Sequence, residues 1–307
     1  STTSRNIVNN IDLSGEGGFV WIKDRTVGDS NSLFTTDRGA NKTLLTDQTD
    51  AEDTVGTTVF ESFNSNGFTV GSHGRTNENN RDYVSWTFRK APKFFDVVTY
   101  TGNETARTIS HNLGSTPGMI ILKRTDSSGH WYVYHKDASE NGSTPGHNNY
   151  LRLNTTGKAT DASWPWNDTA PTDTGFTVSD NAAVNATGGT FVAYLFAHNN
   201  SDGEFGPDGD ADIIKCGSYT GNGSYTTGNI VNVGFEPQFL MIKNASTGST
   251  NWIIYDTMRG YTANNEAQPG LFPNLSDAET SSGGSAYQSF ITSSGFKLMD
   301  SNEAVNK

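Results

Sequence analysis

The sequence predicts an all-β protein built from tandem β-sandwich or jelly-roll domains of a lectin-like kind. A short apolar run that ends in a lysine occurs three times, at 18–23, 118–123 and 239–243. The same motifs follow each copy in the same order, which is the pattern of an internal repeat. No stretch has the 3.6-residue periodicity of an amphipathic helix. Short strands separated by turn residues are typical of sandwiches and jelly rolls.

The repeats divide the chain into three related units. We expect an N-terminal arm or entering strand at 1–17, a first unit at 18–93, a second at 94–205 and a third at 206–307. A chain of 307 residues can hold two or three domains, and the repeat selects three. Because each unit is long enough to enclose its own core, we expect the units to sit like beads with modest interfaces.

The first unit contains the clearest strand pattern. At 82–88, Val84, Trp86 and Phe88 alternate with Tyr83, Ser85 and Thr87, and this period of two indicates a strand. The other strands expected in this unit are 19–23, 32–36, 43–45, 58–63 and 67–70.

The second and third units repeat these pieces. The matching segments are 131–135 with 252–256, 151–154 with 271–274, 94–103 with 212–222, and 190–196 with 82–88. A Gly-Phe pair, as at 175–176, opens one strand of each unit and marks a tight turn or bulge. Four tryptophans recur on the strands and are expected in the core, namely Trp21, Trp86, Trp131 and Trp252. Arg38-Gly39 and Arg259-Gly260 follow the same strand, and we expect a turn whose arginine braces a neighbouring loop.

The third unit lacks its closing strand. Its last residues, 301–307, stop where an aromatic strand should begin, whereas 190–196 follows Asn185 in the second unit. An unpaired sheet edge favours aggregation. We therefore expect either more protein after Lys307 in the natural product or another chain that fills the gap.

Composition and charge exclude several classes of function. The formal net charge is −12, and no stripe of Lys and Arg is present to neutralise phosphates, so we expect no nucleic-acid partner. No apolar stretch approaches the roughly 20 residues of a membrane span. Cys216 is the single cysteine, which excludes an intrachain disulfide and a cysteine zinc site.

No catalytic motif stands out in the sequence. None of the six histidines has a metal-ligand spacing, and there is no nucleophile elbow or phosphate-binding glycine loop. Carboxylate pairs that hydrolyse glycosides leave no sequence signature. Asp126 and Asp137, on either side of the strand at 131–135, are therefore candidates for such a pair. We nevertheless expect the protein to have no enzymatic activity. We also expect no cofactor, apart from a possible Ca²⁺ ion.

The acidic stretch at 202–212 is a candidate Ca²⁺ site. Asp202, Asp208, Asp210 and Asp212 are interspersed with glycines, so several oxygens could turn toward one hard cation. The twelve-residue EF-hand pattern is missing. The alternative interpretation is a solvated acidic linker between the second and third units.

A second candidate site belongs to the second unit alone. Trp164 and Trp166 flank a proline and are followed by Asn167 and Asp168. Two tryptophans beside polar side chains could form an aromatic platform that reads sugar hydroxyls. The alternative is a packed loop that caps the sandwich.

Six motifs together carry a resemblance to a known family. They lie at 18–23, 84–102, 109–114, 164–168, 212–222 and 235–237, and the resemblance extends over nearly the whole chain. The sequence resembles a family of repeated β-domain virion or tail-fibre-like proteins encoded by marine tailed bacteriophages, including those of cyanobacteria. That family has no settled catalytic residues that could be assigned to positions here.

The resemblance implies a non-enzymatic structural protein of a phage virion, most simply a tail fibre, tail appendage or surface adhesin that contributes to host attachment. Its partners would be other virion proteins and a host-surface glycan or protein, and it would assemble into particles in the host cytoplasm. A homo-oligomer is expected, and a trimer would suit a fibre. Two alternatives stay open, a capsid-decorating protein and a carbohydrate-active depolymerase on a lectin-like sandwich.

Overall fold

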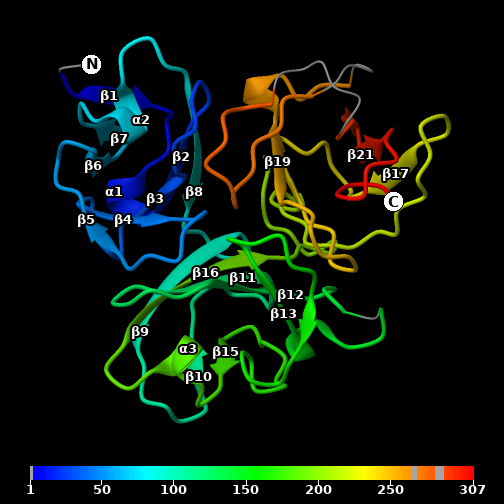
Figure 1. Ribbon diagram of the computed structural model, residues 1–307, viewed down its shortest axis with the longest axis horizontal. Coiled ribbons are helices and arrows are strands. Elements are labelled where there is room, and N and C mark those ends of the chain that lie inside the picture. Colours follow the sequence, from blue (N-terminus) through cyan, green and yellow to red (C-terminus); the bar gives the residue numbers. More distant parts are fainter. Residues whose placement is uncertain (1–2, 141, 264–267, 281–286) are drawn as a thin grey trace.

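The computed structural model describes residues 3–140, 142–263, 268–280 and 287–307. Strands hold 35% of the residues and helices 6%, and the strands form several antiparallel sheets. The predicted all-β, sandwich-type fold is therefore confirmed. Three lobes surround a common centre, and each lobe contains one of the three repeats (Figure 1).

The first unit consists of a five-stranded and a three-stranded sheet. The larger has the order β5 (Asp53–Thr54), β4 (Lys42–Leu45), β3 (Ser32–Thr35), β2 (Gly18–Asp24) and β8 (Tyr83–Arg89), and the smaller has the order β1 (Arg5–Val8), β7 (Gly67–Val70) and β6 (Phe60–Asn64). Two single-turn helices, α1 (Leu13–Glu16) and α2 (Gly74–Asn77), connect them. Within the predicted arm at 1–17, of which residues 1–2 lie outside the described residues, β1 pairs with β7.

The second unit has the same plan, with one more strand in the larger sheet and one fewer in the smaller. Its larger sheet has the order β14 (Thr160–Asp161), β13 (Asn149–Arg152), β12 (Trp131–His135), β11 (Pro117–Arg124), β16 (Thr190–Ala197) and β9 (Phe95–Thr101). Its smaller sheet pairs β10 (Arg107–Ser110) with β15 (Gly175–Val178), and the helical turns are η1 (Gly146–Asn148) and α3 (Ala182–Asn185).

The third unit is reduced on one side. Its sheets are β18 (Phe239–Ile242) with β19 (Ile253–Asp256), and β17 (Asn229–Asn232), β21 (Gly295–Leu298) and β20 (Ser289–Thr292), with η2 (Thr257–Arg259) after β19. An isolated bridge between Ile254 and Leu271 takes the place that β4 and β13 have in the other units.

The lysine-ended strand is central in the first two units. There β2 lies between β3 and β8, and β11 lies between β12 and β16. In the third unit β18 pairs with β19 alone among the described residues. The strand without a counterpart here is the closing strand, which is β8 in the first unit and β16 in the second.

Each unit encloses a core between its two sheets, and a further core is common to all three. This common core is contributed by the first unit (Phe19, Trp21, Leu33, Leu44, Val84, Trp86), the second unit (Ile121, Trp131, Val133, Val192, Tyr194, Phe196) and the third unit (Trp252, Ile254, Leu271), among others. The expectation of beads with modest interfaces is therefore wrong. The physical reason lies in strands such as β2, whose seven residues are all buried, because a strand that is apolar on both faces needs cover on both.

Three equivalent main-chain hydrogen bonds join the units into a closed ring. The amide of Glu52 in the first unit donates to the carbonyl of Thr125 in the second at 2.8 Å. Ala159 of the second donates to Ala245 of the third at 2.9 Å, and Glu279 of the third donates back to Arg25 of the first at 3.0 Å. The ring thus has pseudo-threefold symmetry within one chain.

Candidate functional site

The three repeated lysines seal the junctions of the ring. The Nζ of Lys23 donates to the carbonyl of Ser276 at 3.1 Å, that of Lys123 to Thr49 at 3.2 Å, and that of Lys243 to Thr156 at 3.2 Å. Each bond crosses from one unit to another, and each accepting carbonyl lies on the segment that follows the third strand of its sheet. The lysine that ends each repeated strand is therefore a junction residue.

Burial lowers the pKa of all three ammonium groups. The pKa of Lys123 and of Lys243 falls to about 8, and that of Lys23 is lowered in the same way despite four nearby aspartates. In some enzymes a lysine whose pKa is lowered by burial acts as a nucleophile. Here Lys23 and Lys123 are fully buried and donate to main-chain carbonyls, so their geometry is that of structural donors.

A second side chain reinforces each junction. Trp131 Nε1 donates to the carbonyls of Leu45 and Gln48, both at 3.1 Å, and Trp252 Nε1 donates to Arg152 at 3.0 Å. In the first unit the equivalent position is Asn31, whose amide donates to the carbonyls of Phe272 and Leu275. All four repeated tryptophans are buried, as predicted.

The predicted arginine turns are present. Gly39 and Gly260 have φ of 93° and 101°, in the left-handed region that suits glycine. Arg38 pairs with Glu52 at 2.7 Å, and Arg259 pairs with Glu279 at 2.7 Å while also donating to the carbonyl of Pro269. Each arginine thus braces the loop that carries the ring-forming amide.

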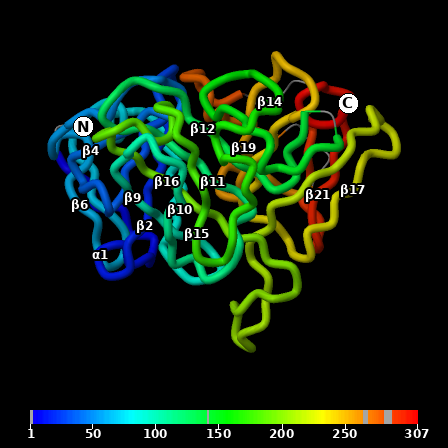
Figure 2. The backbone as a smooth tube through the Cα atoms, turned by 90° about the horizontal axis from the view of Figure 1, so that it is seen from below, coloured from blue at the N-terminus to red at the C-terminus, as the bar shows by residue number. Residues whose placement is uncertain are grey.

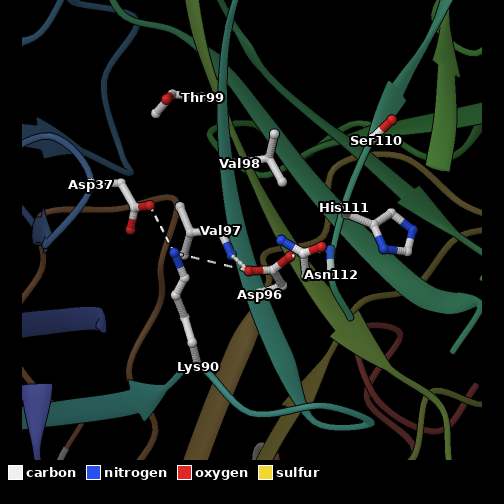
Figure 3. Close-up of a pocket in the computed structure, with 9 residues that line it drawn as sticks. All are labelled: Asp37, Lys90, Asp96, Val97, Val98, Thr99, Ser110, His111 and Asn112. Atoms are coloured by element: carbon white, nitrogen blue, oxygen red, sulfur yellow. Dashed lines mark hydrogen bonds and ion pairs between the residues drawn. The ribbon is translucent and has the colours of Figure 1, made fainter. Parts of the chain in front are cut away.

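A polar pocket of about 300 Å³ opens where the first and second units meet (Figure 3). The Nζ of Lys90 lies 2.8 Å from Asp37 Oδ1 and 4.0 Å from Asp96 Oδ1. Asp96 also accepts hydrogen bonds from the amides of Val97 and Asn112, at 2.9 and 2.8 Å. The charges that line this pocket are therefore already paired with each other.

His111 contributes to the wall of this pocket. Burial lowers the pKa of its imidazole, which Thr172, Asp96 and Asp173 only partly oppose, so the ring is neutral at pH 7. Its Nδ1 accepts a hydrogen bond from the amide of Leu113, and its ring points away from Lys90 (Figure 3). With the hydroxyls of Thr99 and Ser110, the pocket suits a small polar molecule more than an acid–base reaction.

The structure separates the residues of the predicted tryptophan platform. Trp166 is 1% exposed and donates from Nε1 to the carbonyl of Asn149, so its ring belongs to the core. Trp164 is half-buried and packs edge-on against Tyr132, with 5.0 Å between the ring centroids. Asn167 and Asp168 are exposed, with φ of 52° and 47°, in a left-handed turn that presents both side chains to solvent.

An aromatic cluster forms around Trp164 that the sequence reasoning missed. Tyr132 on β12 and Tyr150 on β13 lie side by side, and Trp164 rests on both, 5.3 Å from Tyr150. The guanidinium of Arg152 lies over both tyrosine rings, at 5.8 and 5.4 Å. The available signal was the alternation of Tyr150 and Arg152 on one strand beside Tyr132 on the next.

The acidic stretch lies on a hairpin that projects from the body, near the second unit (Figure 2). Asp212 accepts hydrogen bonds from the amides of Ser201 and Gly203, at 2.8 and 2.9 Å, and Asp202 accepts one from Asn200. Asp208 and Asp210 are exposed at the far end.

No cluster of three or more His, Cys, Asp or Glu side chains that could hold a metal is found in the part of the chain that the structure describes. The Ca²⁺ site remains a prediction from the sequence.

The two candidate carboxylates beside β12 are paired with basic neighbours. Asp126 forms a bridge with Arg124 at 2.9 Å, and Asp137 with Lys136 at 2.7 Å. The hydrogen bond from Arg124 lowers the pKa of Asp126. A carboxylate held ionised in this way is a poor proton donor for glycoside cleavage.

Among the described residues, no helix is both long and apolar enough to cross a membrane. Comparison with curated proteins and with solved structures gives no match. Comparison with family models gives a match over residues 2–307. The chain therefore belongs to the family described as Domain of unknown function (DUF7483).

Proposed function

We propose that this protein is a non-enzymatic structural and adhesive component of a bacteriophage particle, part of a tail fibre or tail appendage that contacts a host-surface glycan. The observation that carries the proposal is the closed ring, in which the repeated lysines, tryptophans and arginines all serve the junctions between units. A body fixed in this way is suited to hold surface loops at constant positions.

The aromatic cluster around Trp164 supports the choice of a glycan. Trp164, half-buried and supported by the buried ring of Tyr132, is an aromatic side chain of the kind that packs against sugar C–H groups, and Arg152, Asn167 and Asp168 provide donors and acceptors for hydroxyls. These groups lie on a rigid sheet and the loop that it supports. Because Arg152 is part of the β13 ladder, its position does not depend on a mobile segment.

Glycan-array binding tests this proposal, with the wild-type chain beside Trp164→Ala. The wild type is expected to bind a restricted set of glycans, and Trp164→Ala to lose up to about tenfold in affinity, in line with about 0.5–1.5 kcal/mol for an aromatic contact. Tyr225→Ala is the matched control, since Tyr225 is an aromatic residue 47% exposed in another unit. Equal binding by wild type and Trp164→Ala would contradict the assignment of the cluster.

Two further readouts separate the alternatives. Counting copies in purified particles distinguishes a tail appendage, with a few copies, from a capsid-decorating protein, with hundreds. Release of reducing sugar from a bound glycan, abolished by one Asp or Glu substitution, would favour a depolymerase and overturn the non-enzymatic proposal.

A further inference from the structure

The position of Arg152 is repeated in all three units, but its charge is not. The main-chain carbonyls of Leu45, Arg152 and Phe272 each accept the hydrogen bond that reinforces one junction of the ring. Leu45 and Arg152 also have the same place in their sheets, opposite Ser32 and Tyr132. Since the other two units have leucine and phenylalanine there, the ring uses only the main chain at this position. The repeated fold therefore does not require the guanidinium of Arg152.

The aromatic residues around Arg152 are also confined to the second unit. Tyr132 corresponds to Ser32 of the first unit, because each lies opposite the position just described. Tyr150, two residues before Arg152 on β13, corresponds in the same way to Thr43. The tyrosines and the arginine are thus an addition to the repeated plan, in contrast to the lysines and arginines of the junctions.

Arg152 is a partly buried cation that lacks a carboxylate partner. Arg38, Arg124 and Arg259 each pair with an aspartate or glutamate, at 2.7, 2.9 and 2.6 Å. Within the part of the chain that the structure describes, Arg152 forms no such pair. Its Nε is buried with no hydrogen-bond partner, and its Nη2 makes a long contact of 3.4 Å with the hydroxyl of Tyr150. A charge that is withdrawn from water without a partner costs free energy, which an anionic ligand would offset.

The side chains that surround Arg152 leave its charge in place. The guanidinium lies over the rings of Tyr132 and Tyr150, which position it without neutralising it. Burial raises the pKa of Tyr132 and lowers that of His130, so both side chains are neutral at pH 7. Asp168, which belongs to the proposed glycan contact, is exposed and forms no ion pair with Arg152. The charge over the two tyrosines is therefore positive, although the chain has a net charge of −12.

We propose that the glycan bound at the aromatic cluster carries a carboxylate, as a uronic acid does, and that Arg152 pairs with it. This inference rests on the glycan contact proposed above and specifies the class of sugar. The planar guanidinium can donate two parallel N–H bonds to the two oxygens of one carboxylate, which a neutral hydroxyl cannot match. Arg152 is thus the residue that distinguishes acidic from neutral glycans, while Trp164 contacts the C–H groups of either.

Binding to paired acidic and neutral glycans tests the proposal. The 307-residue chain is assayed on an array of glucuronic, galacturonic and mannuronic acid oligosaccharides, each beside its carboxyl-reduced, neutral counterpart. We expect an acidic oligosaccharide to bind at least about tenfold more tightly than its reduced counterpart, because a hydrogen bond to a charged group contributes more than one between neutral groups. Raising the salt concentration from about 0.05 to about 0.5 M should narrow this difference, because salt screens partly exposed charges.

Arg152→Leu is the matched variant, because the first unit has leucine at this position, Leu45. It is expected to melt as a folded protein and to lose the preference for the acidic oligosaccharide. Arg152→Lys keeps the charge without the planar fork and should retain part of the preference. Arg107→Leu is the control, since Arg107 also lies over a tyrosine ring, that of Tyr100, but donates to the carbonyl of Thr101. The preference of this control should equal that of the wild type.

The outcomes separate this inference from the glycan contact on which it rests. Tighter binding of the acidic oligosaccharide that is lost in Arg152→Leu supports both. Binding of neutral and acidic glycans alike, weakened by Trp164→Ala and unchanged in Arg152→Leu, would leave the glycan contact standing and overturn the carboxylate. Absence of binding to every glycan would overturn the glycan contact and this inference with it.

Discussion

Replacement of Lys123 by methionine is expected to change how stability depends on pH. Burial lowers the pKa of Lys123 from the usual 10.5 to about 8 in the folded protein. Below pH 8 the ammonium is charged in both states, and the folded state bears the full cost of holding it, roughly 3 kcal/mol. Between pH 8 and 10.5 the folded state loses the proton first, so this cost disappears and stability rises.

The size of the effect follows from the two pKa values. Integration of the proton difference between pH 8 and pH 10 gives a gain of about 2 kcal/mol for the wild type from this one lysine. Lys123→Met lacks the group, so the wild-type advantage over the variant should grow by that amount over the same interval. Above pH 10 the buried tyrosines act in the opposite direction, as with Tyr134, whose pKa burial raises to about 12.

Urea unfolding at pH 7, 8, 9 and 10 measures this difference. Methionine preserves the apolar stem, and Lys158→Met, at an exposed position, is the matched control whose profile should stay parallel to that of the wild type. Parallel profiles for wild type and Lys123→Met would refute the reasoning, because the ammonium would then carry no burial cost.

Two further outcomes are expected. Trp131→Phe removes the indole donor from the carbonyls of Leu45 and Gln48, of which Leu45 keeps the amide of Gln48, and should lower the unfolding free energy by about 1–3 kcal/mol. Trp21→Phe is its control, since the Nε1 of Trp21 is buried with no partner among the described residues, and thermal melts should show the smaller loss there. Burial raises the pKa of the Cys216 thiol to about 12, so a thiol reagent at pH 8 should modify it only after unfolding; rapid labelling of the native protein would contradict its placement in the core.

The sequence predicts the strands better than their assembly. The alternation at 82–88 and the burial of Trp21, Trp86, Trp131 and Trp252 are local consequences of a two-faced strand, and the structure confirms them. The short helices were not predicted, because a single turn such as α3 lacks a helical period. The closed ring was not predicted either. Its acceptors are main-chain carbonyls, such as that of Thr49, and a carbonyl has no residue identity that a sequence can reveal.

The candidate sites show the same division. The two tryptophans that flank a proline at 164–168 indicate a candidate site. The sequence does not reveal that Trp166 turns inward and donates to the carbonyl of Asn149, while Trp164 stays near the surface. Tyr132 and Tyr150 join Trp164 through the pairing of β12 with β13, which depends on register. The acidic hairpin was recognisable by composition, whereas the bonds from amides to Asp212 depend on its turn geometry.

The closure of the ring is tested most directly by scalar couplings across hydrogen bonds, measured by NMR on the deuterated chain. The account predicts three equivalent correlations, from the amide nitrogens of Glu52, Ala159 and Glu279 to the carbonyl carbons of Thr125, Ala245 and Arg25. The third is decisive, because it joins the third unit back to the first. A Glu279 amide that exchanges with solvent as fast as a free loop, with no coupling to Arg25, would mean that the units are strung in a line.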